Sequence, residues 1–266
     1  MKRLKRISRI LLAVTAVMMI GLNAYEFIMK DKEPPVISFP DGELSVSIAA
    51  TEKELVQDVK AKDNRSGDIS SSVVVEKMSS IDENASRVVT YAAIDKAGNV
   101  GRQERLIAYT DYTKPRFDLA GPLRFPLEKI PDNIMEGVTV SSSIDGDISE
   151  KVKFQFLEDQ YYNQAGVLDI EIRVVDSAGV NTVLPTKLEW YDPKEETIPV
   201  TLTQYIVYLE AGAEFNPNDY LSEVDPKAKV QVESDVDTST AGVYHVEYLV
   251  ESGNNQGKSR LIVVVE

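Results

Sequence analysis

The tetrapeptide Gly-Asp-Ile-Ser (GDIS) occurs twice in this chain, at residues 67–70 and again at residues 146–149, 79 positions later. The flanking sequence repeats as well. "ELVQDVKAKDNRSGDISSSV" begins at Glu54, and "NIMEGVTVSSSIDGDISEKV" begins at Asn133. Hydrophobic and polar residues alternate at matching places in both stretches, which is the period of a β-strand. The two stretches therefore predict a duplicated β-rich fold.

Other landmarks recur at nearly the same distance. "VVTYAAIDKAGNV" (residues 88–100) and "DIEIRVVDSAGVN" (residues 169–181) both contain Asp-x-Ala-Gly, with the aspartates 81 positions apart. Pro35 and Pro115 are 80 positions apart. A fainter third copy, "TSTAGVYHVEYLVESGNN" (residues 238–255), keeps the alternation but has no GDIS. The spacing predicts a repeat of about 80 residues.

Short alternating strands with frequent turn residues and almost no helix are typical of antiparallel β-sandwiches. We expect an all-β fold with three tandem sandwiches after an N-terminal helix. They are a first repeat at residues 34–112, a second repeat at residues 113–192 and a divergent third repeat at residues 193–266. Short helical turns are expected near residues 52–56 and 134–135.

We interpret the glycines and aspartates of the recurring motifs as turn formers. Glycine accepts a positive φ, and an aspartate side chain can accept hydrogen bonds from nearby backbone N–H groups. The predicted turn residues are Gly67, Asp68, Asp95, Gly98, Gly146, Asp147, Asp176 and Gly179.

These motifs resemble the bacterial immunoglobulin-like (Ig-like) repeats of Gram-positive surface proteins and some insecticidal crystal toxins. The first repeat fits that pattern at Pro34, Pro35, Ile37, Asp63, Asn64, Gly67, Asp68, Ile69, Asp95, Ala97, Gly98 and Asn99. The second repeat has Ser142-Ser143 where the pattern has Asp-Asn, and the third keeps only its Thr-Ala-Gly-Val-Tyr stretch. The resemblance implies three Ig-like domains at a cell surface, and it names no ligand.

The N-terminus predicts a membrane anchor. Residues 1–9 form a basic head, and residues 10–25 carry no charge. We expect residues 10–29 to cross the cell membrane once, with the head in the cytoplasm and the C-terminus outside. The alternative is a signal peptide cleaved after Ala24, which would release a secreted ligand-binding protein, although Leu22 is bulky for the cleavage pattern.

Composition excludes some classes of function. Residues 31–266 hold 23 basic and 42 acidic residues, a net charge of −19, which disfavours nucleic acid as a partner. The chain has no cysteine, so disulfides and thiolate metal sites are excluded. Large exported eukaryotic domains usually carry disulfides, and their absence favours a bacterial exported protein.

Two groups of carboxylates are candidate calcium ligands, because hard cations prefer oxygen donors. One group comprises Asp63, Asn64, Asp68 and Asp95, for which turn formation is the favoured interpretation. The other comprises Asp31, Asp111 and Asp192 at the repeat junctions, where Lys114 and Arg116 beside the second aspartate disfavour a cation. We expect no cofactor.

Catalysis is not expected, because His245 is the only histidine and no Gly-x-Ser-x-Gly elbow or Ser-x-x-Lys occurs. A surface for a partner is predicted at two tyrosine pairs, Tyr161 with Tyr162 in a loop and Tyr205 with Tyr208 on one strand face. Residues 261–265, apolar on both faces, predict either a buried final strand or an open edge for a partner in the third repeat. The expected function is non-catalytic spacing or binding of an envelope protein or polysaccharide near the membrane.

Overall fold

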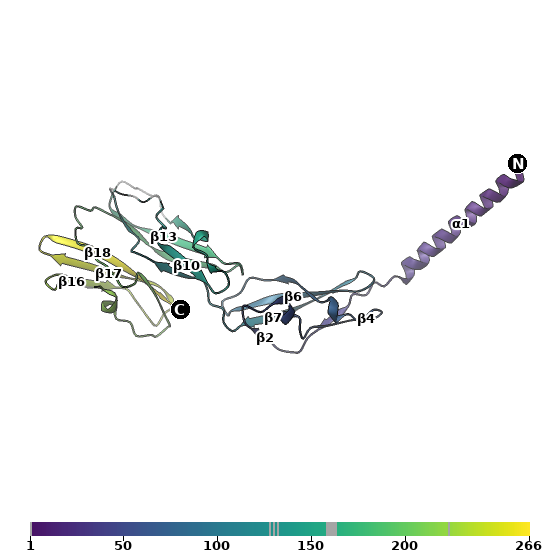
Figure 1. Ribbon diagram of the computed structural model, residues 1–266, viewed down its shortest axis with the longest axis horizontal. Helices are drawn as coiled ribbons and strands as arrows, with labels where there is room; N and C mark the ends of the chain where they lie inside the picture. The colour runs from purple at the N-terminus through teal and green to yellow at the C-terminus, as the bar shows by residue number, and fades with distance from the viewer. Residues whose placement is uncertain (1, 128, 130, 132, 158–163, 223) are drawn as a thin grey trace. The chain divides into compact units, whose positions relative to one another are not determined.

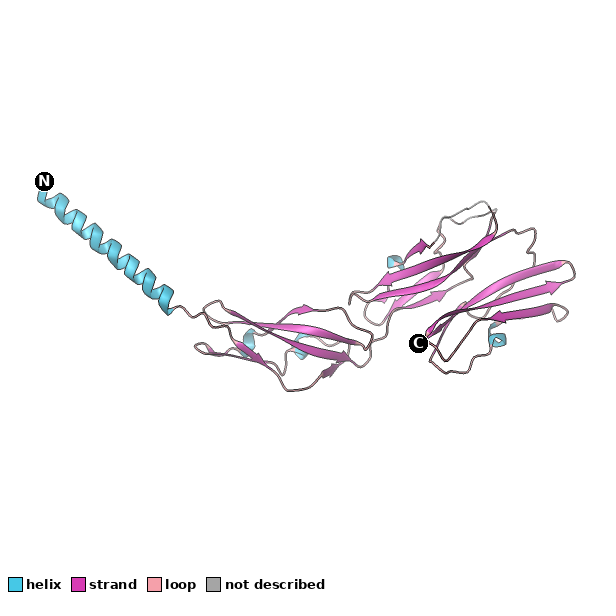
Figure 2. Cartoon of the chain, turned by 180° about the vertical axis from the view of Figure 1, so that it is seen from behind, coloured by secondary structure: helices cyan, strands magenta, loops and turns pink. Residues whose placement is uncertain are grey.

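The computed structural model describes residues 2–127, 129, 131, 133–157, 164–222 and 224–266, and Figures 1 and 2 show an N-terminal helix followed by strands. The chain forms two compact units. The first comprises Met1–Ser79 with Ser86–Thr110, and the second comprises Ser80–Ala85 with Asp111–Glu266. The protein is therefore mostly β-sheet, as the alternation predicted.

Helix α1 (Lys2–Met29) is the long helix of the structure. Its segment Ser8–Tyr25 is long and apolar enough to cross a membrane, and none of that segment is buried within the protein. A membrane anchor and a signal sequence both have this length and composition.

Two sheets form the β-structure of the first unit. One has the order β1-β3-β4, and the other has the order β2-β7-β6-β5. Their strands are β1 (Val36–Ser38), β2 (Leu44–Val46), β3 (Lys60–Asp63), β4 (Gly67–Asp68), β5 (Val74–Met78), β6 (Ser86–Ile94) and β7 (Val100–Tyr109). Val89, Tyr91 and Ala93, which alternate along β6, are all buried and belong to the inward face of this strand.

The second repeat also has two sheets, in the orders β11-β10-β8 and β12-β13-β14-β9. Their strands are β8 (Arg116–Leu119), β9 (Arg124–Pro126), β10 (Val138–Ser142), β11 (Gly146–Asp147), β12 (Lys153–Phe156), β13 (Gly166–Val175) and β14 (Asn181–Tyr191). Ile170, Ile172 and Trp190 are among the buried residues of this core. The short helix expected near residues 52–56 is α2 (Glu52–Leu55), capped by Thr51, whereas residues 134–137 form only a turn.

The third repeat has one four-stranded sheet, in the order β15-β18-β17-β16. Its strands are β15 (Ile206–Leu209), β16 (Lys229–Ser234), β17 (Gly242–Ser252) and β18 (Asn255–Val265). Within the described residues, the facing layer is reduced to the bridge between Leu202 and Leu221 and the 3₁₀ helix η3 (Pro217–Tyr220). In the other repeats GDIS forms a short strand followed by a 3₁₀ helix, η1 (Ser70–Ser72) or η2 (Ser149–Lys151), whereas the stretch that replaces it has a 3₁₀ helix but no such strand among its described residues.

One sheet order recurs three times along the chain. The three orders are β2-β7-β6-β5, β9-β14-β13-β12 and β15-β18-β17-β16. In each, the strand that comes latest in the chain (β7, β14 or β18) pairs antiparallel with the strand that precedes it in the chain. On its other side it pairs parallel with an edge strand (β2, β9 or β15). The sequence repeat therefore corresponds to a repeated structural element.

Both GDIS turns have the same geometry. Gly67 and Gly146 have φ values of +76° and +71°, a region that favours glycine. The Oδ1 atoms of Asp68 and Asp147 each accept a hydrogen bond, 2.9 Å long, from the backbone N–H of the serine two positions later. The aspartates thus hold the turn, and the glycines allow it.

Strand β18 is covered on both sides, which agrees with the buried final strand and not with the alternative of an open edge. It lies between β15 and β17, so both of its backbone edges are paired. Leu261 and Val263 pack into the core of the third repeat. Ile262 points to the other face and belongs to the same core as Phe117 and Trp190 of the second repeat. The strand is apolar on both faces because it contributes to two cores.

Glycine is required where the chain enters the first repeat. A Cβ atom on Gly101 of β7 would lie 1.9 Å from the backbone oxygen of Pro35. The entering segment therefore passes directly over the last strand, which fixes residues 31–35 against the first repeat.

Candidate metal site

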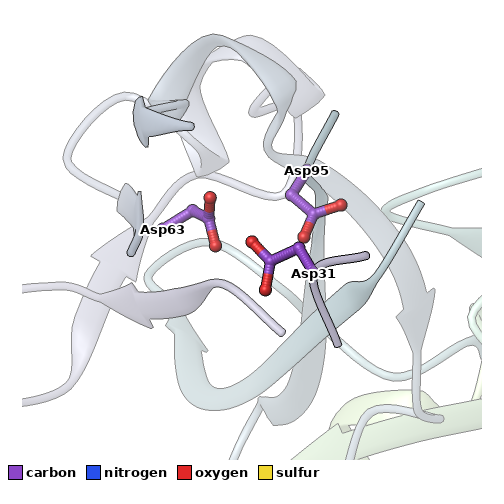
Figure 3. A group of neighbouring side chains, drawn as sticks. All are labelled: Asp31, Asp63 and Asp95. Atoms are coloured by element: carbon purple, nitrogen blue, oxygen red, sulfur yellow. The ribbon is translucent and has the colours of Figure 1, made fainter. Parts of the chain in front are cut away.

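Three aspartates from separate parts of the first unit meet in the structure. Asp31 precedes β1, Asp63 ends β3, and Asp95 directly follows β6. β1 and β3 are antiparallel, with Val36 opposite Lys62, so the start of one strand lies beside the end of the other. Figure 3 shows the three carboxylates turned toward one another.

The aspartates are close together and shielded from solvent. One carboxylate oxygen from each lies within 4.8 Å of those from the other two. Asp31, Asp63 and Asp95 are only 8%, 3% and 7% exposed. Carboxylates are rarely this buried without a compensating partner, so their hydrogen bonds decide how the group is stabilised.

Backbone N–H groups hold one oxygen of each carboxylate. Asp31 Oδ1 accepts from the N–H of Glu33 at 3.1 Å, and Asp95 Oδ1 accepts from the N–H of Asn99 at 2.8 Å. Asp63 Oδ1 accepts from the N–H groups of Arg65, at 3.1 Å, and Ser66. These bonds fix the orientation of all three side chains.

The second oxygens differ in what they contact. Asp95 Oδ2 accepts from the side-chain amide of Asn99 at 2.6 Å. Asp31 Oδ2 lies 3.7 Å from Nε of Arg65, whose side chain is 55% exposed. Asp63 Oδ2 is buried and has no hydrogen-bond partner among the described residues.

The hydrogen bonds keep two of the carboxylates ionised. The backbone hydrogen bond from Ser66 lowers the pKa of Asp63 from its ordinary value, against the opposing effect of burial. Burial raises the pKa of Asp95, but the hydrogen bonds from Asn99 outweigh it, so the net shift is also downward. Both groups therefore carry negative charge at neutral pH.

The structure brings together only part of the predicted calcium set. Asp63 and Asp95 meet, but Asn64 donates to Glu33 Oε2 at 2.6 Å and Asp68 is used by its own turn. Asp31 was placed in a different group, with Asp111 and Asp192 at the repeat junctions. The antiparallel pairing of the first strand with the third is the signal that could have joined Asp31 to the others.

Among its described residues, the second repeat has no equivalent of this group. Its corresponding residues are Asp111, Ser142 and Asp176. Ser142 Oγ accepts from the N–H groups of Ile144 and Asp145, at 3.2 and 3.3 Å, as Asp63 Oδ1 does in the first repeat. Asp176 Oδ2 accepts from the Tyr112 hydroxyl at 3.1 Å. The serine therefore caps the turn but has no second oxygen to present to a cation.

The predicted tyrosine surface is not free for a partner at Tyr208. Its hydroxyl accepts a hydrogen bond from the Phe117 N–H at 2.8 Å, and its ring lies 4.8 Å from the guanidinium carbon of Arg116. Burial raises the pKa of Tyr208 to about 12. Tyr205 packs against the cores of both the second and third repeats. Tyr161 and Tyr162 lie outside the described residues.

His245 lies on the face of β17 opposite the core of its repeat, which contains its neighbour Val246. Its Nε2 atom is 3.2 Å from the Thr186 hydroxyl of β14. Burial, together with the positive charge of Arg260, lowers the pKa of His245 from its ordinary value. The contact places the imidazole between the second and third repeats.

Comparison with known proteins adds one match in sequence. Residues 202–264 match a family model described as bacterial surface protein, Ig-like domain. This supports an Ig-like surface domain in the third repeat, the copy that diverges most from the other two. No curated protein matches the sequence.

Three solved structures are among those that match most of this chain, at low identity and low TM-score. The M60 catalytic domain with CBM51-1 and CBM51-2 from Clostridium perfringens ZmpB is 10% identical, with a TM-score of 0.25 over 86% of this chain and 42% of that chain. Drosophila N-cadherin EC1-4 is 11% identical, with a TM-score of 0.23 over 88% of this chain and 76% of that chain. Human CDH23 EC21-23 is 12% identical, with a TM-score of 0.22 over 87% of this chain and 100% of that chain. None of these superpositions is close enough to carry an argument about this chain.

Proposed function

We propose that this chain is a non-catalytic, membrane-anchored protein of a bacterial cell surface, with three tandem Ig-like domains outside the membrane. The observation that carries the proposal is the match of residues 202–264 to a surface Ig-like domain. The sheet order that occurs three times extends this interpretation to the first and second repeats. The resemblance of the first repeat to Gram-positive surface repeats supports the same compartment.

Helix α1 acts as the anchor in this proposal. Five of the first nine residues are basic, which favours a cytoplasmic N-terminus. The helix continues past Ala24 to Met29, and Leu22 does not fit the small-residue cleavage pattern. Retention of the anchor is therefore favoured over release of a secreted protein.

Binding or spacing is favoured over catalysis. The chain lacks cysteine, and its one histidine is placed against Thr186 between two repeats. The partner we propose is a protein or polysaccharide of the envelope close to the membrane, because only the short segment of residues 30–33 separates α1 from the first repeat.

The test is recovery of the partner with the full-length chain. A tagged chain is cross-linked on intact cells with a reagent that does not enter them, and co-sedimentation with purified wall polymer is measured in parallel. We expect a specific partner in one of the two assays and the tagged chain in the membrane fraction. A chain found in the cytoplasm, or one with no external partner in either assay, would contradict the proposal.

The third repeat cannot be tested by deletion. Removal of residues 193–266 would also remove Ile262 and Ile206, which belong to the core around Trp190. Loss of binding in such a truncation would report damage to the second repeat as well. Substitutions at exposed side chains are the appropriate variants.

A further inference from the structure

The two oxygens of Asp63 have different surroundings. Oδ1 accepts both backbone hydrogen bonds of the turn that follows β3. Oδ2 is buried and has no hydrogen-bond partner among the described residues, and the carboxylate as a whole faces those of Asp31 and Asp95 (Figure 3). A buried oxygen that carries negative charge is costly unless it is compensated. The turn alone does not explain it, because the turn uses only Oδ1.

The second repeat shows what the turn requires. Ser142 at the equivalent position caps the same two N–H groups with a single hydroxyl oxygen. A serine is therefore sufficient for this turn in this chain. The second carboxylate oxygen of Asp63 is therefore not needed to form the turn, and its presence requires another explanation.

Charge balance points to a cation of charge +2. Three carboxylates meet in the site, and Arg65 forms an ion pair with one of them, Asp31. Its guanidinium lies 3.7 Å from Asp31 and also donates a hydrogen bond to the backbone oxygen of Met29, and its side chain is mostly exposed. With Arg65 counted, two negative charges remain uncompensated, and a divalent cation would neutralise them.

We propose that Asp31, Asp63 and Asp95 bind a divalent cation, and that the cation is Ca²⁺. All three side chains offer oxygen donors, which suit hard cations, whereas zinc and copper prefer nitrogen or sulfur ligands. Ca²⁺ accepts irregular and bidentate carboxylate coordination and completes it with water, whereas Mg²⁺ requires near-octahedral geometry.

The cation would tie the membrane-proximal linker to the first repeat. Asp31 lies two residues after the end of α1, while Asp63 and Asp95 end strands of different sheets. Bound Ca²⁺ would restrict the short segment between α1 and β1 and so stiffen the connection to the membrane. An affinity of about 0.1–1 mM is expected, as for other extracellular calcium modules. The expected affinity depends on the proposed extracellular location, whereas the binding of Ca²⁺ does not depend on it.

The test uses the full-length chain in detergent, stripped with EDTA and then titrated with CaCl2, MgCl2 or ZnCl2 by calorimetry. We expect one Ca²⁺ per chain, weaker Mg²⁺ binding and no Zn²⁺ binding at this site. Asp63→Ser copies the second repeat, so it should fold normally and bind Ca²⁺ at least about tenfold more weakly. Asp68→Asn, outside the group, should bind like the unmodified chain. Arg65→Gln should bind more tightly, because a competing positive charge is removed.

Two measurements keep the test decisive. Circular dichroism in EDTA checks that Asp63→Ser is folded, and Asp63→Asn replaces it if it is not. Trp190, the only tryptophan, lies in the second unit. The melting temperature measured by its fluorescence should therefore not change when Ca²⁺ is added. The proposal is overturned if the unmodified chain does not bind Ca²⁺, or if the folded Asp63 variant binds it with unchanged affinity.

Discussion

The hydroxyl of Tyr208 in β15 accepts a hydrogen bond from the backbone N–H of Phe117 in β8, with 2.8 Å between oxygen and nitrogen. The bond joins the third repeat to the second. Ile206 and Ile262 lie in the same hydrophobic core as Phe117. The second and third repeats therefore stabilise each other.

Replacement of Tyr208 by phenylalanine should destabilise the second unit. The substitution keeps the ring but leaves the Phe117 N–H without its acceptor, at a cost of about 1–3 kcal/mol. Denaturation followed by Trp190 fluorescence measures the effect. Tyr244→Phe is the matched control, because that hydroxyl bonds to Thr240 at an exposed site. Equal stability of the two variants would show that the Tyr208 bond contributes nothing.

A buried ionic network provides a second contact between these repeats. Arg124 of β9 forms a paired interaction with Glu189 of β14, at 2.8 and 3.0 Å, and also contacts Glu196 at 2.7 Å. Arg260 of β18 lies 3.3 Å from Glu189. Burial raises the pKa of Glu189, but the hydrogen bonds and charge of Arg124 outweigh it and hold the pKa below its ordinary value.

Glu189→Gln should cost about 1.5–3 kcal/mol, because it removes the charge-assisted hydrogen bonds from Arg124, although Arg124 keeps Glu196 and Arg260 keeps Glu247. The same change at an exposed pair, Glu251→Gln beside Lys229, should cost less than about 1 kcal/mol. Denaturant unfolding of the two variants gives both free energies. A Glu189 variant no less stable than the Glu251 variant would contradict the interpretation of this network.

The sequence predicted strands, turns and the inward faces, because these depend on local alternation and on glycine and aspartate at fixed positions. It did not predict which repeats share a core. From the sequence alone, Ile262 fits either an open strand or a covered one, because the element that packs against it is not known. An exposed tyrosine and a tyrosine that packs between two repeats, as Tyr208 does, look the same in the sequence.

The metal site was only partly predicted for a related reason. Asp63 and Asp95 end strands within the recognised motifs, so they were considered together. Asp31 lies outside the repeat boundary at residue 34 and was assigned to the linkers. Its position became clear only from the pairing of β1 with β3.

The second unit should lose stability as the pH falls below about 6.5, the ordinary pKa of histidine. Burial and Arg260 lower the pKa of folded His245, so the unfolded state binds the proton more readily in this range. Arg260, Lys187, Asp235 and Asp169 are the charged groups that act on it. Melting of Trp190 fluorescence between pH 7.5 and 5.5 should show the loss, and His245→Gln should reduce it. An equally steep loss in that variant would assign the effect to another group.

Calcium should protect the linker from protease. Lys30 and Lys32 flank Asp31 and are exposed, so trypsin can cleave there. Bound Ca²⁺ should slow this cleavage in the unmodified chain, because it restricts the segment, and should have no effect in Asp63→Ser. Mass spectrometry of the fragments identifies the cleavage sites. Protection in both chains would show that calcium acts elsewhere, for example on trypsin itself.

The most direct test of the central claim is the membrane topology of the chain. The protein has no cysteine, so Lys5→Cys and Lys227→Cys each introduce a single labelling site, the second at an exposed position in the third repeat. An impermeant maleimide on intact cells should label Lys227→Cys, while Lys5→Cys should be labelled only after permeabilisation and at the mass of the full chain. Labelling of Lys5→Cys on intact cells, or protection of Lys227→Cys, would contradict the account. Loss of the Lys5→Cys label from the mature protein would show cleavage and a secreted product.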